Sequence, residues 1–202
     1  GDPGQIKPFT TLNEGQWRGL EVSPLESAAA TLLTTRPDTV RVALPVSWRL
    51  PSHSADLISR AFYASPFVAG SAPEERALTM PMGALDDPYD QAVRIAADGG
   101  WALVELPGGP APNLDLEVAD AVAATVLALV DADIQIRDGA RAEPLQPLRV
   151  AVGTAHTAQV DAVRRALREQ CIAANRVVPA VVISTANRLQ GREFDVTIVW
   201  HP

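Results

Sequence analysis

Polar residues suited to holding phosphate groups follow three apolar stretches of this 202-residue sequence. Arg49 lies in the turn after "VRVAL", residues 154–157 follow "RVAV", and residues 185–193, which surround Gly191, follow "VVIS". Arginine side chains, hydroxyl groups and the amides at the start of a helix all bind phosphate oxygens. The residue types therefore indicate a phosphate-binding site. The alternative interpretation is that these residues form surface loops that cap helices.

The C-terminal half of the chain alternates between short β-branched stretches and stretches of helical periodicity. We predict strands over residues 101–106, 148–154, 180–185 and 195–200, and helices over residues 116–130 and 157–170. This alternation predicts an α/β fold in which crossover units build a parallel sheet. Ligands of such sheets bind beyond the carboxyl ends of the strands, where the polar clusters lie. The helix residues expected to point inward are Val118, Val122, Val126, Leu129, Val160, Val163 and Leu167.

The N-terminal half gives weaker signals. Gly and Pro predict a loop at residues 1–9, a Ser-Pro-Leu-Glu capping pattern predicts a helix over residues 24–34, and an alternating stretch predicts a strand over residues 39–44. Ser52 or Ser54 is expected to begin another helix. From about residue 64 to residue 100, frequent Pro, Gly, Asp and Ser predict an irregular insertion. The helix after Ser52 should bury one stripe, made of Leu57, Ile58, Ala61 and Phe62.

Composition excludes several classes of function. The net charge of -7 argues against a whole-chain electrostatic attraction to nucleic acid or to an anionic membrane. Residues 86–138 hold eleven acidic and two basic residues, whereas residues 149–192 hold seven Arg and two acidic residues, so an anionic partner is expected at the C-terminal quarter. No apolar stretch approaches the roughly 20 residues of a membrane span, which predicts a cytoplasmic protein with no membrane partner.

The cysteine and histidine residues predict neither a disulfide nor a metal centre. Cys171 is the only cysteine, and its setting in "ALREQCIAA" predicts a partly buried helix residue rather than a nucleophile. His53 and His201 have no partners at metal-ligand spacing, so no zinc site is expected.

Four stretches carry a resemblance to a known family: "GDPGQIKPF", "VSWRLPSHSADLISRAFY", "RVAVGTAHTAQVDAVRRAL" and "VISTANRLQGREFDVTIV". In this order they resemble the motifs of superfamily 1 helicases, most of all the branch of the nonsense-mediated mRNA decay helicase. The family patterns are G-D-x-x-Q-L, Y-R-M-h-P followed by F-Y, V-I-T-P-Y-x-x-Q and T-x-x-x-x-Q-G-x-E. The resemblance implies a RecA-like α/β domain with a parallel sheet and helices on both faces. It covers both ends and the middle of the chain but not residues 64–100.

In the family, five matching positions serve ATP, which is bound with Mg²⁺. Gln5 stands at the glutamine that couples the terminal phosphate of the nucleotide to the nucleic-acid side. Arg49 stands at the arginine that reaches the γ-phosphate from the second domain. Gly191 lets the backbone approach the nucleotide, and Glu193 accepts hydrogen bonds from the ribose. Arg192 is expected near phosphate, or alternatively in an ion pair with Glu193 or Asp195. Asp195 is expected to orient the loop.

Three further positions imply contacts with single-stranded nucleic acid. Thr154 and Thr185 match hydroxyls that hold backbone phosphates, which grip any base sequence. His156 is either a base-stacking residue or simply a helix-start histidine. The chain departs from the family at Trp48, where the family has Tyr, and at the Ala-His of residues 155–156, where it has Pro-Tyr.

The motifs that complete an ATPase are missing from the sequence. It has no G-x-x-x-x-G-K-[ST] phosphate loop, no Asp-Glu magnesium pair before "GDPGQI" and no arginine finger at its end. The chain is therefore interpreted as a fragment, with residues 1–22 as a tail of the first RecA-like domain and residues 23–202 as the second. We expect no ATPase or unwinding activity from it alone, because ATP lies between the two domains. The family implies 5′ to 3′ travel on DNA or RNA.

Two other functions fit the same residues. The first is a RecA-like module that has lost catalysis and serves as a binding or scaffold unit. The second is an unrelated doubly wound nucleotide-binding enzyme, which the strand and helix rhythm alone would support.

Overall fold

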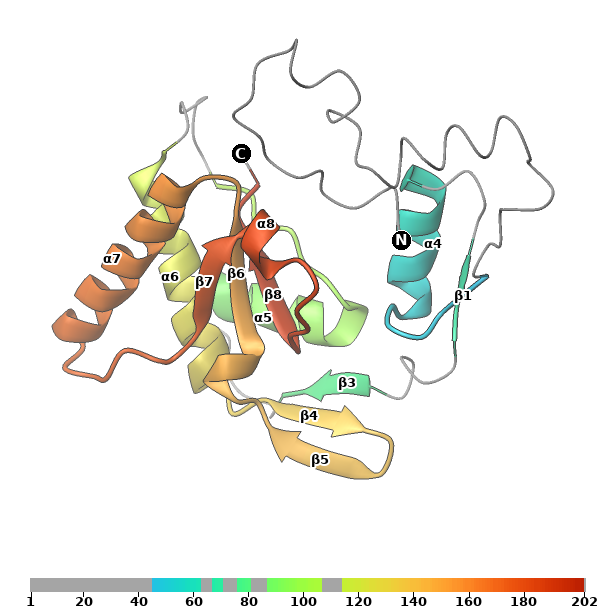
Figure 1. Cartoon of the computed structure of the whole chain (residues 1–202). Helices are drawn as coiled ribbons and strands as arrows, with labels where there is room; N and C mark the ends of the chain where they lie inside the picture. Colours follow the sequence, from blue (N-terminus) through green and yellow to red (C-terminus); the bar gives the residue numbers. More distant parts are fainter. Residues whose placement is uncertain (1–44, 63–66, 71–75, 81–86, 107–113, 202) are drawn as a thin grey trace, which may run out of the picture. The chain divides into compact units, whose positions relative to one another are not determined.

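The computed structural model describes residues 45–62, 67–70, 76–80, 87–106 and 114–201 (Figure 1). The chain divides into two compact units, Gly1–Glu74 and Glu75–Pro202, and each is described by itself. Gln5, the predicted helix at residues 24–34 and the predicted strand at residues 39–44 lie outside the described residues.

The first unit contains a helix between two short parallel strands. β1 (Val46–Ser47) pairs with β2 (Val68–Ala69), and α4 (Ser52–Phe62) connects them. The helix prediction is confirmed, but its buried face was predicted wrongly, because Ala55 and Ser59 are buried whereas Leu57 is 47% exposed. The Ser59 hydroxyl oxygen accepts a 2.9 Å hydrogen bond from the backbone N–H of Phe67. Small residues on this face therefore let α4 lie close to β2.

The second unit is built on a three-stranded parallel sheet. Its strands are β6 (Val150–Thr154), β7 (Val182–Thr185) and β8 (Val196–Val199), in the order β7-β6-β8. α7 (Thr157–Ala173) connects β6 to β7, and α8 (Ala186–Leu189) connects β7 to β8. All five residues of β6 are buried. The prediction of an α/β fold with a parallel sheet is thereby confirmed.

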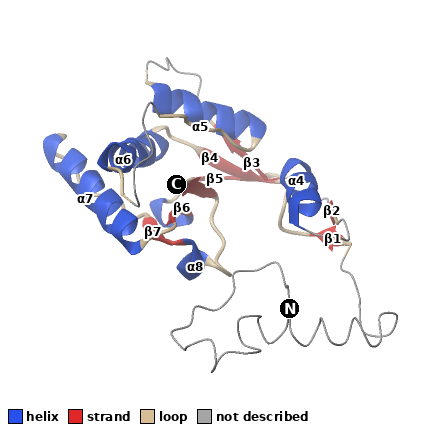
Figure 2. Ribbon diagram, turned by 90° about the horizontal axis from the view of Figure 1, so that it is seen from above, coloured by secondary structure: helices blue, strands red, loops and turns tan. Residues whose placement is uncertain are grey.

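Helices cover both faces of this sheet. β7 and β8 flank β6 on opposite sides, so the two crossovers step in opposite directions, and right-handed crossovers then require opposite faces. Val152 packs against α6 (Leu116–Asp131) and α7. Gly153 points the other way, where an added Cβ would lie 3.5 Å from the Leu189 side chain of α8. Figure 2 shows α7 and α8 on opposite sides of the β6–β7 pair.

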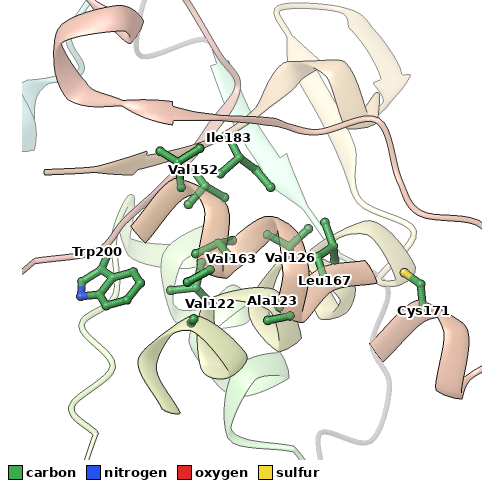
Figure 3. Close-up of a cluster of buried hydrophobic side chains, with 13 residues drawn as sticks. Val122, Ala123, Val126, Val152, Val163, Leu167, Cys171, Ile183 and Trp200 are labelled. Atoms are coloured by element: carbon green, nitrogen blue, oxygen red, sulfur yellow. The ribbon is translucent and has the colours of Figure 1, made fainter. Parts of the chain in front are cut away.

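The main core lies between this sheet and the pair α6 and α7 (Figure 3). Of the helix residues predicted to point inward, Val118 is only half-buried and all the others are buried. Cys171 was predicted to be partly buried, but it is fully buried in this core. The helical periodicity therefore located the core correctly. The buried residues of this cluster are Ala119, Val122, Ala123, Val126, Val152, Val160, Ala162, Val163, Ala166, Leu167, Cys171, Ile183 and Trp200.

A small antiparallel sheet, which the sequence did not predict, lies in the same unit. β3 (Arg76–Thr79) pairs with β4 (Gln135–Asp138), and β4 forms a hairpin with β5 (Arg141–Pro144). α5 (Pro88–Gly99) packs on β3 and α6, and a short 3-10 helix, η2 (Pro147–Arg149), leads into β6. The expectation of an irregular insertion over residues 64–100 is therefore wrong, because β2, β3 and α5 fall within it.

Residues 101–106 do not form the predicted strand. The segment is irregular and all six of its residues are exposed, including Trp101 at 56% and Leu103 at 82%. A largely apolar composition favours a strand only where a neighbouring strand completes its hydrogen bonds, and this segment makes no such pairing with the described strands.

Candidate functional site

The carboxyl edge of the parallel sheet brings two of the predicted site residues together. Thr154 is the last residue of β6, Thr185 is the last residue of β7, and the two are Cα partners in the β6–β7 register. Each is followed by a helix, α7 after Thr154 and α8 after Thr185. Two threonines from separate motifs therefore lie side by side where open α/β sheets bind their ligands.

The hydroxyl group of Thr154 is already engaged. Its side chain is buried, at 2% exposure, and its Oγ1 donates a 3.1 Å hydrogen bond to the backbone carbonyl of His156. Because a hydroxyl has one proton to donate, Thr154 in this conformation holds the turn before α7 rather than offering a donor to solvent. Thr185 is half-buried, and His156 and Thr157 are exposed at the same edge.

Gln159 organises this turn, and the sequence reasoning did not single it out. Its side chain is 1% exposed, and its Oε1 accepts hydrogen bonds from the backbone N–H groups of Ala155 (3.1 Å) and His156 (3.0 Å). These amides precede the first turn of α7, where the helix itself supplies no acceptor. A glutamine three residues after a helix N-cap was the available signal, because it is half of a capping box.

α8 and Gly191 carry the chain away from this edge. Thr185 caps α8, and Arg188 is exposed in the last turn of that helix. The backbone N–H of Arg192 donates to the Leu189 carbonyl at 3.0 Å, and Gly191 adopts φ +80°. Only glycine adopts that left-handed conformation without steric cost. The glycine in the Gln-Gly-Arg-Glu motif is thus explained by a tight turn that reverses the chain after α8.

Arg192 packs on an aromatic ring. Its guanidinium carbon lies 5.0 Å from the centroid of the Phe194 ring, which is within cation–π range. Asp195, one of the two ion-pair partners considered for Arg192, accepts hydrogen bonds from Arg149 and Arg76 instead. The ring contact restricts the Arg192 guanidinium to the face of Phe194.

Arg149 lies at the amino end of β6, and Asp195 lies at the amino end of β8. The Arg149 Nε and Nη2 atoms donate to the Asp195 carboxylate at 3.1 and 2.9 Å. These hydrogen bonds and the charge of Asp195, with a smaller contribution from Glu193, raise the pKa of Arg149 above its usual value. Glu193 is therefore electrostatically linked to the amino end of the sheet, whereas Thr154 and Thr185 lie at the carboxyl end.

The last of the predicted site residues that the structure describes is Arg49. Arg49 is exposed and lies in the first unit, after β1, where the Ser47 hydroxyl accepts hydrogen bonds from the backbone N–H groups of Arg49 (3.4 Å) and Leu50 (3.2 Å). Among the residues the structure describes, no three His, Cys, Asp or Glu side chains gather closely enough to hold a metal ion. Within that same part of the chain, no helix is long and apolar enough to span a membrane.

The side chains at the carboxyl edge are suited to contacts with anionic phosphate groups. Thr185, His156, Thr157 and Asn187 offer hydrogen-bonding side chains there, and Arg188 adds a positive charge. Such groups bind phosphate and sugar oxygens of any base sequence. No protein-family model and no curated protein matches the chain.

Proposed function

We propose that this chain is the second RecA-like domain of an ATP-dependent superfamily 1 helicase, supplying half of the ATP cleft and part of a single-strand nucleic-acid track. The observation that carries the proposal is the pairing of Thr154 with Thr185 in the sheet register. The resemblance assigns nucleic-acid contacts to both threonines, which come from motifs 31 positions apart in the sequence. A strand of nucleic acid crossing the carboxyl edge would meet both motifs at once.

Within this track the two threonines have different roles. Thr185, half-buried at the N-cap of α8, makes no cap hydrogen bond with its side chain, so its hydroxyl suits a phosphate contact. Thr154 fixes the turn before α7 through its bond to His156, which sets the position of the exposed Thr157 and of the helix-start amides. Contacts of this kind carry no base specificity, as a translocating motor requires.

The nucleotide half of the proposal rests on residues 191–193 and on Arg49. Gly191 has a left-handed conformation and carries no side chain, and an added Cβ there would meet nothing within 4 Å. Glu193 is exposed, so its carboxylate is accessible to ribose hydroxyl groups. These features fit ATP, whose Mg²⁺ and phosphate loop would come from the first RecA-like domain. Arg49 would add a guanidinium for the γ-phosphate.

Binding to a labelled single strand tests the track. We expect the chain to bind a fluorescent oligonucleotide at low ionic strength, with an affinity that falls as salt rises. Thr185→Ala should weaken binding about ten- to a hundredfold, because one hydrogen bond to a charged phosphate is worth about 1.5–3 kcal/mol. Thr197→Ala, at an exposed threonine of β8 away from the edge, is the matched control and should leave affinity unchanged. Equal affinities for all three proteins would reject the track.

ATP hydrolysis tests the nucleotide half. The chain joined to its first RecA-like domain should hydrolyse ATP faster when single-stranded DNA or RNA is added, and Arg49→Ala should abolish that stimulation. Binding of the single strand without any turnover would favour the catalytically silent binding module instead.

A further inference from the structure

Asp195 is the centre of an ionic cluster that joins three strands. Its side chain is only 9% exposed, and its two carboxylate oxygens accept hydrogen bonds from two arginines, Arg149 at the amino end of β6 and Arg76 at the start of β3. Its backbone N–H also donates to the Arg149 carbonyl at 2.9 Å. Asp195 and Arg149 therefore bind each other through both main chain and side chain. A carboxylate this poorly hydrated needs such partners to stay charged.

Arg76 extends the cluster into the antiparallel sheet. Its Nη2 lies 2.8 Å from Asp195 Oδ1, and its Nε lies 3.8 Å from Asp138 Oδ2. Arg76 and Asp138 are opposite each other in the β3–β4 register. One guanidinium thus bridges the β3–β4–β5 sheet and Asp195, the residue immediately before β8.

The position of Asp195 in the chain gives the cluster a second consequence. Residues 191–193 are held at one end by the Arg192-to-Leu189 backbone hydrogen bond and at the other by Asp195. Between these points Arg192 lies over Phe194, and Glu193 interacts with Arg149 electrostatically. The loop therefore has a fixed start, a fixed end and a short span between them. A shift of Asp195 has to be accommodated within the loop.

We propose that Asp195 is a positioning residue for the loop of residues 191–193, and that Arg76 makes the loop's conformation depend on the β3–β4–β5 sheet. The meaning of this for nucleotide binding rests on the function proposed above. The dependence of the loop on Asp195 and Arg76 does not rest on that function, because it involves only contacts within the second unit. Anything that displaces the antiparallel sheet would then alter the loop through one side chain.

The two arginines differ in a way that allows a sharp test. Arg149 presents two nitrogens to the carboxylate, which a lysine cannot reproduce, whereas Arg76 contacts Asp195 through Nη2 alone. Arg76→Lys should therefore preserve the linkage, and Arg149→Lys should not. Arg137→Gln is the matched control, since Arg137 is an exposed arginine of the same antiparallel sheet, on β4, outside the cluster.

The experiment is backbone amide hydrogen exchange on the whole chain, which requires no nucleotide. Asp195→Asn, Arg149→Lys and Arg76→Gln should each speed exchange at residues 191–194 by about two- to fivefold, the range expected for loss of a partly exposed ion pair. Arg76→Lys and Arg137→Gln should exchange there as the unchanged chain does. Amides in the middle of α7 should not change in any variant, because the hydrogen bonds and ion pairs of the cluster join Arg76, Arg149, Asp138 and Asp195 and do not involve α7.

Three results would overturn the proposal. Unchanged exchange at residues 191–194 in Asp195→Asn would show that the cluster does not position the loop. An effect of Asp195→Asn without any effect of Arg76→Gln would remove the dependence on the antiparallel sheet. Faster exchange in α7 as well would show a general loss of stability instead of positioning. The two proposals can fail separately. If the variants speed exchange at residues 191–194 as expected, but the chain joined to its first RecA-like domain hydrolyses no ATP, the positioning role is retained and the helicase function is rejected.

Discussion

Arg176 and Asp131 join the carboxyl-terminal ends of the two helices that cover the main core. Asp131 is the last residue of α6, and Arg176 lies just beyond α7, with its Nη2 2.7 Å from Asp131 Oδ1 and its Nη1 bonded to Oδ2. Asn175, in the left-handed region at φ +50°, turns the chain so that the Arg176 N–H donates to the Cys171 carbonyl at 2.9 Å. The hydrogen bonds to Asp131 raise the pKa of Arg176 above its usual value. A helix-ending turn thus aims the guanidinium at the neighbouring helix.

Replacing Arg176 with Ala should lower the free energy of unfolding by about 1 kcal/mol or less, because both side chains are partly exposed to water. Urea denaturation would measure the loss. Because the interaction is ionic, the difference should shrink at about 1 M salt, where charges are screened within about 3 Å. Arg168→Ala is the control at an exposed position of α7, and an equal loss in that variant would contradict the prediction.

Gln159→Ala should lower the stability of the chain more than its small change in side-chain volume suggests. The substitution leaves the backbone N–H groups of Ala155 and His156 without the Gln159 acceptor, at a cost of about 1–3 kcal/mol for each group that water does not reach. Thermal unfolding would report the loss. Gln159→Glu should be milder, because a carboxylate still accepts both bonds and suits a helix N-terminus. A smaller loss of stability in Gln159→Ala than in Gln159→Glu would contradict this explanation.

At Gly191 the backbone conformation alone should set the cost of substitution. An added Cβ meets nothing within 4 Å, so Gly191→Ala should cost about 1–2 kcal/mol through its left-handed φ of +80°. Gly191→Asn should cost less, since Asn tolerates this region better than Ala. At Gly153, φ is not in that region and the added Cβ would make ordinary contact with Leu189. Denaturation curves in which Gly191→Asn is less stable than Gly191→Ala would refute the conformational explanation.

Truncating the core between sheet and helices should be costly. Leu167 is 1% exposed and packs in the main cluster, so Leu167→Ala should lower the free energy of unfolding by about 2–5 kcal/mol. Leu148→Ala, at a leucine that is 65% exposed, is the matched control and should change it by less than about 0.5 kcal/mol. Both values come from urea denaturation. Similar losses at the two positions would mean that the core is placed wrongly.

The long elements of the second unit were predictable because one signal dominates each. α6 and α7 repeat apolar residues at helical spacing, and β6 is a short β-branched stretch that ends in a polar turn. The antiparallel sheet was not predictable in this way. It pairs residues 76–79 with residues 135–138, and strands that carry Arg, Asp and Pro give no alternating pattern. Sheet pairing between distant segments leaves little trace in either of them.

Two errors had local causes. α5 carries its own signals, an Asp87 N-cap and Pro88 at the first helical position, but the Pro, Gly and Asp around it favoured an irregular interpretation. Residues 101–106 have strand composition without a strand beside them. For the candidate site, the sequence placed Thr154 and Thr185 at the ends of two predicted strands, and their pairing in register is a finding of the structure. That Thr154 donates to His156, and that Asp195 is held by two arginines, depends on side-chain geometry that spacing does not encode.

The order of the strands along the chain has a consequence for biosynthesis. Every strand of the parallel sheet lies between Val150 and Val199, and the central strand β6 comes first, with its two neighbours following on either side. A nascent polypeptide that has extended past α7 but not past β8 therefore presents β6, all of whose residues are buried in the folded sheet, with at least one bare edge. Until β8 has been synthesised, this edge of β6 is open to non-native strand pairing.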